Sequence, residues 1–175
     1  LSVNDYQLHV LYNGDDNYRR ADDKANFTVN KIDPSILVNT SDIDYHDSET
    51  INVSVDDDAT GSVSITVTNE NGDVVYSGSS DLSDSKASFT VPGLPAGKYD
   101  VTVEYSGDDN YNSAIGKANF TVNKVDTPVN ADTENITYGD DETINVSVND
   151  DATGDVTITI SKDGVPVYEE TLPVD

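Results

Sequence analysis

The chain has 175 residues, of which 35% are hydrophobic, and it contains no Cys, Met or Trp. One or two domains are therefore expected, with cores of Val, Ile, Leu, Phe and Tyr, and these residue types favour a pleated, all-β fold. The 9 Lys and Arg against 34 Asp and Glu give a formal charge of −25, which repels nucleic-acid phosphates and anionic lipids alike. We therefore expect no nucleic-acid partner, and no apolar run is long enough for membrane insertion of this segment.

Two motifs near the start of the chain return further along it. GDDNY at Gly14 and KANFTVNK at Lys24 recur at Gly107 and Lys117, in both cases 93 residues later. INVSVDDDATG, in the middle of the chain, recurs as INVSVNDDATG with the same separation. A period of 93 residues is too long for a helical solenoid and fits one sandwich domain of about 100 residues.

The period divides the chain into three parts. Residues 32–124 are expected to form a complete immunoglobulin-like repeat. Residues 1–31 are then the C-terminal strands of a preceding repeat, and residues 125–175 are the N-terminal strands of a following one. Tyr168 in the third part matches Tyr76 at a separation of 92, so one residue is missing before it.

Within residues 32–124, apolar residues alternate with polar ones, as in half-buried strands. The expected strands cover residues 36–38, 51–55, 63–67, 74–76, 87–91, 99–105 and 118–122. Turns rich in Gly, Pro, Asn and Asp separate them, and about seven short strands with such turns are typical of a β-sandwich. The linkers NKIDP at Asn30 and NKVDTP at Asn123 are short and contain proline, which predicts a semi-rigid rod.

The segment LPAGKYDVTVEYSGDDNY at Leu94–Tyr111 resembles the signature of group 3 bacterial-type immunoglobulin-like repeats. Together with YGDDETINVSVNDDATG at Tyr138–Gly154, it also resembles the repeated modules of adhesin-like surface proteins of methanogenic archaea. The resemblance implies a β-sandwich on the cell surface, without catalysis, that acts as a spacer or an adhesive module. Tyr99 and its counterpart Tyr6 resemble the tyrosine corner of such sandwiches, the alternative being ordinary core tyrosines.

Catalysis would require a nucleophile, a base or a metal on a rigid scaffold. The chain offers only His9 and His46, without Cys or a GxSxG motif, and neither His recurs in another copy. We therefore predict that the protein is not an enzyme and requires no cofactor.

Acidic turns are the strongest candidates for a binding site. Loops that share one pole of a sandwich should bring Asp56–Asp58 close to Asp108–Asn110, and stacked repeats would place the acidic loop of a neighbouring copy opposite them. Carboxylate oxygens are ligands for calcium, so the sequence predicts Ca²⁺ at junctions between repeats, the alternative being solvated turns. The candidate metal ligands are Asp56, Asp57, Asp58, Asp108, Asp109, Asp140, Asp141 and Glu142.

Six N-x-S/T triplets are candidates for glycosylation, which would suit a surface protein, although strands rich in Asn and Thr also produce such triplets by chance. They begin at Asn26, Asn39, Asn52, Asn119, Asn135 and Asn145.

The leading functional hypothesis is a structural spacer segment of an extracellular, cell-surface adhesin-like protein or filament. Its expected partners are neighbouring copies of itself, because residues 1–31 and 125–175 each leave strand edges unpaired. In consecutive copies these two segments are predicted to complete each other, either within a tandem array or, in a filament, head to tail by strand complementation. The alternative is an adhesive module that binds glycan or host protein directly, although loops that are identical in successive copies favour a structural role.

Overall fold

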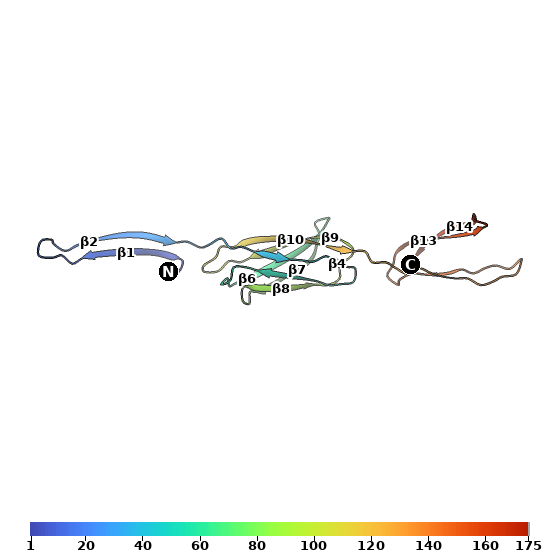
Figure 1. Ribbon diagram of the computed structural model, residues 1–175, viewed down its shortest axis with the longest axis horizontal. Helices are drawn as coiled ribbons and strands as arrows, with labels where there is room; N and C mark the ends of the chain where they lie inside the picture. The colour runs from blue at the N-terminus through green and yellow to red at the C-terminus, as the bar shows by residue number, and fades with distance from the viewer. Residues whose placement is uncertain (175) are drawn as a thin grey trace. The chain divides into compact units, whose positions relative to one another are not determined.

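The structure, a computed structural model, describes residues 1–174, and its regular elements over that range are all β-strands (Figure 1). The chain divides into two compact units, Leu1–Lys124 and Val125–Asp175. The predicted all-β fold is confirmed.

The first unit begins with a hairpin of β1 (Asn4–Tyr12) and β2 (Ala21–Val29), paired antiparallel from Asn4 opposite Val29 to Tyr12 opposite Ala21. Eight strands follow, here called the sandwich domain: β3 (Leu37–Asn39), β4 (Ile43–Asp44), β5 (Glu49–Ser54), β6 (Ser62–Asn69), β7 (Val74–Asp81), β8 (Lys86–Val91), β9 (Gly97–Tyr105) and β10 (Ala114–Asn123). They form a five-stranded sheet, ordered β4-β10-β9-β6-β7, and a three-stranded sheet, ordered β3-β5-β8.

The sandwich domain has eight strands instead of about seven because its first segment serves both sheets. β3 pairs antiparallel with β5, and the chain then crosses over so that β4 runs parallel to β10. Gly116 on β10 allows the close approach, since a Cβ there would lie 2.7 Å from the Ile36 Cγ2 atom. Glycine is the residue that lets another segment pack this tightly against a strand.

The core contains the apolar residues that the alternation predicted on β5, β6, β8, β9 and β10. Its buried members include Ile51, Val53, Val55, Val63, Ile65, Val67, Phe89, Val91, Val101, Val103, Phe120 and Val122. These residues come from both sheets, so the core lies between two sheets packed face to face.

The strand expected at residues 74–76 is present as the start of β7, but its side chains differ in burial. Val74 is 61% exposed and Val75 is also exposed, whereas Tyr76 is partly buried against the core. β7 is an edge strand, and the register of its pairing with β6 shifts between Val67 and Thr68. Such an irregularity redirects side chains at a strand end, so only the third residue of the segment faces inward.

Tyr99 and Tyr6 make the same contact in the sandwich domain and in the hairpin. The Tyr99 hydroxyl donates to the Pro95 carbonyl oxygen at 2.7 Å, and the Tyr6 hydroxyl donates to the Ser2 carbonyl oxygen at 2.7 Å. Each bond reaches four residues back along the chain, which is the geometry of a tyrosine corner. The hydroxyl thereby fixes the segment that leads into β9 or β1.

The second unit consists of two short antiparallel pairs. β11 (Asn130–Asp132) pairs with β12 (Asn145–Ser147), and β13 (Gly154–Lys162) pairs with β14 (Val165–Val174). Asp163 and Gly164 close the second hairpin with positive φ angles of 53° and 79°, as a tight two-residue turn requires. This shorter turn accounts for the residue that the third part lacks before Tyr168.

Candidate functional site

One end of the sandwich domain is formed by the loop between β5 and β6 and the loop between β9 and β10. We call residues 56–60 and 106–112 the junction pole. Thr60 donates to Asp108 Oδ2 from its backbone nitrogen at 2.7 Å and from its hydroxyl at 2.9 Å. The prediction that these two acidic loops lie close together is confirmed.

Two tyrosines hold the junction pole from the inside. The Tyr105 hydroxyl donates to the Thr60 carbonyl oxygen at 2.7 Å, and the Tyr111 hydroxyl donates to Asp58 Oδ1. Burial, with a smaller contribution from Asp108, raises the pKa of Tyr105 to about 12. The hydrogen bond to Asp58 raises the pKa of Tyr111 to about 12. Both hydroxyls therefore remain protonated donors at neutral pH.

Asp108 organises the loop that carries it. Desolvation alone would raise the pKa of Asp108, but hydrogen bonds from the backbone of Thr60, Asn110 and Tyr111 and from the Thr60 hydroxyl outweigh it. The pKa of Asp108 is therefore held well below its usual value. Its Oδ1 atom accepts from the Asn110 and Tyr111 nitrogens at 2.8 Å each, so an ionised carboxylate closes the loop.

The segment that follows β2 docks onto this pole. The Ile32 nitrogen donates to the Asn110 carbonyl oxygen, and the Asn112 nitrogen donates to the Ile32 carbonyl oxygen, both at 2.9 Å. Lys31 Nζ donates to the Asp108 carbonyl oxygen at 2.5 Å, and Asn112 Nδ2 donates to Asp33 Oδ1 at 2.7 Å. The linker thus joins the β9–β10 loop as a short parallel bridge.

Sequence reasoning missed this docking. The linker was predicted to be semi-rigid because of its proline, whereas the contacts that hold it are hydrogen bonds to residues more than 70 positions away in the sequence. Lys31 and Asp33, which make two of these contacts, recur at the same spacing as Lys124 and Asp126.

The candidate metal ligands near the pole mostly accept hydrogen bonds from the protein itself. Asp56 Oδ2 accepts from the Ser35 nitrogen at 3.3 Å, and Asp58 and Asp108 are engaged as described above. Asp57 and Asp109 are exposed on the same loops. Among residues 1–174, no group of three or more His, Asp or Glu side chains is placed to hold a metal ion. Calcium between neighbouring copies stays a prediction.

The third acidic turn lies in the second unit, where its side chains stabilise the local backbone. Asp140 Oδ2 accepts from the Thr137 nitrogen at 3.2 Å, and Glu142 Oε1 accepts from the Glu134 nitrogen at 2.8 Å. Asp141 is exposed. The counterpart of Glu142 in the sandwich domain, Glu49, is 3% exposed, and its Oε1 atom accepts from the Ser41 nitrogen at 2.7 Å.

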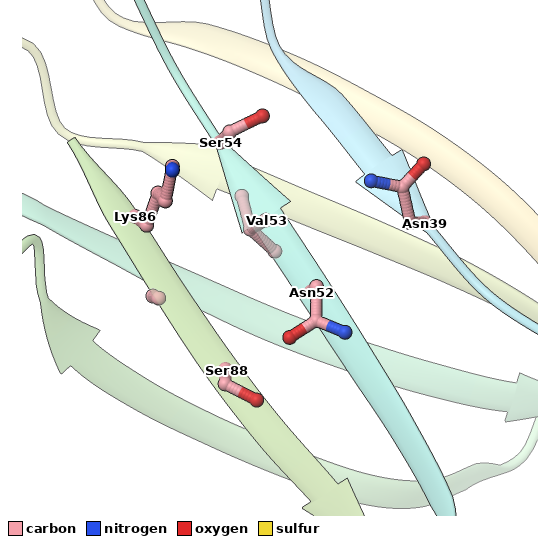
Figure 2. Close-up of a pocket in the computed structure, with 7 residues that line it drawn as sticks. Asn39, Asn52, Val53, Ser54, Lys86 and Ser88 are labelled. Atoms are coloured by element: carbon pink, nitrogen blue, oxygen red, sulfur yellow. The ribbon is translucent and has the colours of Figure 1, made fainter. Parts of the chain in front are cut away.

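The six candidate glycosylation sites are all exposed. Asn39 and Asn52 lie directly opposite each other on β3 and β5, and Asn52 is also opposite Ser88 on β8. Figure 2 shows these polar side chains around a hollow of about 340 Å³ on the three-stranded sheet, together with Ser54 and Lys86. The strand positions of Asn26 and Asn119 point outward, Asn135 lies in a loop, and Asn145 begins β12.

The two histidines lie apart from the pole. His9 Nε2 is 3.1 Å from Asp22 Oδ2 on the exposed surface of the hairpin. The His46 ring lies against the Tyr45 ring at a tilt of 38°, with ring centroids 3.9 Å apart. The Tyr45 nitrogen donates to the Asn123 carbonyl oxygen at the far end of β10. His46 is therefore at the opposite end of the domain from the junction pole.

Comparisons with known proteins agree with the sandwich architecture. The family described as bacterial Ig-like domain (group 3) matches residues 37–123. A search of curated proteins found no match. The part of the chain that the structure describes has no helix with the length and apolar character needed to cross a membrane.

Two solved structures resemble the chain weakly. CopC from Methylosinus trichosporium OB3b is 17% identical, with a TM-score of 0.44 over 53% of this chain and 97% of that chain. Escherichia coli alpha-2-macroglobulin activated by porcine elastase is 12% identical, with a TM-score of 0.43 over 98% of this chain and 21% of that chain. At these TM-scores neither likeness bears on function.

Proposed function

Because residues 37–123 belong to the bacterial Ig-like (group 3) family, we propose that this chain is a non-catalytic structural segment of an extracellular protein. The segment acts as a spacer in a cell-surface adhesin-like protein or an extracellular filament. A spacer has to transmit orientation from one domain to the next, and the linker is the part of the chain on which this depends.

The docked linker carries the proposal. Four hydrogen bonds join Lys31, Ile32 and Asp33 to the β9–β10 loop, and each contributes about 0.5–1.5 kcal/mol. A freely flexible linker of the same length would allow the flanking elements to rotate independently. Here the backbone of the linker is paired with the domain that follows it, so the direction of β2 is coupled to the direction of the sandwich.

The hollow on the three-stranded sheet does not favour the adhesive alternative. Its lining residues are Asn39, Asn52, Val53, Ser54, Lys86, Ala87 and Ser88 (Figure 2). None of them is aromatic, whereas binding surfaces are usually anchored by tyrosine or tryptophan.

The spacer proposal is tested by measuring how firmly the hairpin is held. The chain has no cysteine, so Asp16→Cys and Asn71→Cys place two nitroxide labels in exposed turns of the hairpin and the sandwich domain. At high dilution we expect a single narrow distance distribution. Adding Lys31→Ala and Ile32→Pro, which removes the Nζ donor and the backbone donor, should broaden it.

Two controls make the result specific. Lys24→Ala removes an exposed lysine of the same repeated motif and should leave the distribution narrow. A second label pair, Asp16→Cys with Ser2→Cys, reports whether the hairpin itself is formed. A broad distribution in the unaltered linker, with the hairpin intact, would contradict the proposal.

A further inference from the structure

The segment that enters the sandwich domain lies beside the segment that leaves it. At the junction pole, Ile32 forms a parallel bridge with Tyr111. At the opposite end of the domain, β4 pairs in parallel with β10, and Ile43 lies opposite Val122. We call residues 32–44 and 111–123 the terminal pair, because the chain enters the domain through the first segment and leaves it through the second.

The separation in sequence between paired residues is constant along the terminal pair. It is 79 positions in both bridges and in three further hydrogen bonds of 2.7 Å. These bonds join Asn112 Nδ2 to Asp33 Oδ1, Thr40 Oγ1 to the Asn119 carbonyl oxygen, and the Thr121 nitrogen to Asp42 Oδ1. Between them, Gly116 allows the Ile36 side chain to pack directly against β10. The terminal pair is therefore held in one register from end to end.

The direction of this pairing sets it apart from the rest of the chain. Among residues 1–174, β4 and β10 are the only named strands that pair in parallel, and the other strand pairs are antiparallel. Both segments of the terminal pair run from the junction pole to the far end of the domain. The chain therefore enters beside Ile32 at one end and leaves after Asn123 at the other.

Tension along the chain would consequently load the terminal pair in shear. A pull on both sides of the domain draws the first segment toward the junction pole and the second toward the far end. The two segments can only slide past each other, so their hydrogen bonds share the load and have to break together. In an antiparallel hairpin pulled through its two open ends, by contrast, the bonds open one after another.

The core adds resistance to the same movement. β3 is paired with β5, and Val38 lies opposite Val53. Val38 and Ile43 pack against the core, and Val122 is 1% exposed. A slip of one residue between strands turns inward side chains to the other face. Sliding of the terminal pair therefore exposes apolar side chains as well as breaking hydrogen bonds.

From this geometry we propose that the sandwich domain is a load-bearing element and that the terminal pair is its mechanical clamp. The inference rests on the proposed spacer function and deepens it. A spacer joins the parts of a protein on either side of it, so any tension between those parts passes through Lys31 and Lys124. The register of the terminal pair is what lets the domain stay folded under that tension.

The first test compares two pulling directions in the full-length chain by single-molecule force spectroscopy. The chain has no cysteine, so handles are attached through introduced cysteines at exposed positions. Asn30→Cys with Lys124→Cys loads the terminal pair along its length. Asn30→Cys with Asp109→Cys separates the two segments from the junction pole alone. At the same pulling speed, we expect the sandwich domain to unfold at a higher force in the first geometry. Equal forces, or a higher force in the second, would overturn the proposal.

The second test removes bonds of the clamp without changing the core. Thr40→Val with Asp42→Ala deletes two hydrogen bonds of the terminal pair. The matched control, Asn69→Ala, deletes two hydrogen bonds of the β6–β7 turn, which Asn69 Oδ1 accepts from the Asn71 and Asp73 nitrogens. Both proteins should melt at a lower temperature than the unaltered chain.

The unfolding rate at constant force should separate these two variants, because forced unfolding depends on the barrier and not on the equilibrium. With handles at positions 30 and 124, we expect the clamp variant to unfold about tenfold faster than the unaltered chain. The Asn69 variant should unfold at nearly the unaltered rate. Equal acceleration in both variants would show that the terminal pair is not the clamp. The label distances without load report on the linker, so a narrow distribution combined with equal unfolding forces would reject the clamp and leave the spacer proposal standing.

Discussion

The sandwich domain and the two ends of the chain have nearly the same apolar pattern but bury it to different extents. Val103 is completely buried and Phe120 is 2% exposed, whereas their counterparts Val10 and Phe27 are 55% and 46% exposed. The strands and their register are the same in both hairpins. Alternation therefore defines which face of a strand is apolar, and burial depends on whether a second layer covers it.

The largest difference in stability between the two regions is expected from substitutions in the core of the sandwich domain. Ile65→Ala should destabilise the sandwich domain by about 2–5 kcal/mol, because it leaves a cavity between two fixed sheets. Its counterpart change, Ile158→Ala, should leave the domain's unfolding midpoint unchanged, since the second unit is compact on its own. Urea denaturation at low protein concentration, followed by circular dichroism, distinguishes the two. Equal losses would mean that the two parts share one core.

A substitution at the junction pole should have a smaller effect on the free energy of unfolding, and that effect should depend on pH. The pKa of Asp108 is lower in the folded state than in the unfolded chain, so its contribution to stability is present above the usual Asp pKa. This contribution to stability is lost as the pH falls through the pKa that Asp108 has in the folded state. Asp108→Asn should cost about 1–3 kcal/mol at neutral pH and flatten the loss of stability below about pH 4.

The matched control for Asp108 is its exposed neighbour. Asp109→Asn leaves the Thr60, Asn110 and Tyr111 contacts in place and should change neither the midpoint nor its pH dependence. Thermal melts of the three proteins between neutral and acidic pH provide the measurement. A normal acid response in the Asp108 variant would show that the carboxylate does not close the loop.

Much of the fold could be predicted because period-two alternation is a local signal. The inward residues of β5, β6, β8, β9 and β10 follow directly from it. The division of the first segment into β3 and β4 could not be predicted, because it depends on two different partner strands and on the close approach at Gly116. The exposure of Val74 could not be predicted either, since the pattern does not reveal a register shift at an edge.

The candidate site was predictable in position but not in chemistry. The two acidic loops meet because sandwich topology places them at one pole. Their oxygens accept hydrogen bonds from backbone nitrogens and tyrosine hydroxyls, and this depends on geometry that composition does not encode. The linker docks partly through backbone groups of Ile32 and Asn110. Every residue type carries these groups, so the sequence does not reveal such contacts.

The same strand pattern is covered by a second sheet in the sandwich domain and exposed in the hairpin of β1 and β2. Residue-resolved amide hydrogen exchange at low protein concentration tests it most directly. The amides of β9 should be strongly protected because β9 lies between β6 and β10, while amides along the free edge of β1 should exchange rapidly. Equal protection of β1 and β9 in the dilute monomer would contradict the claim.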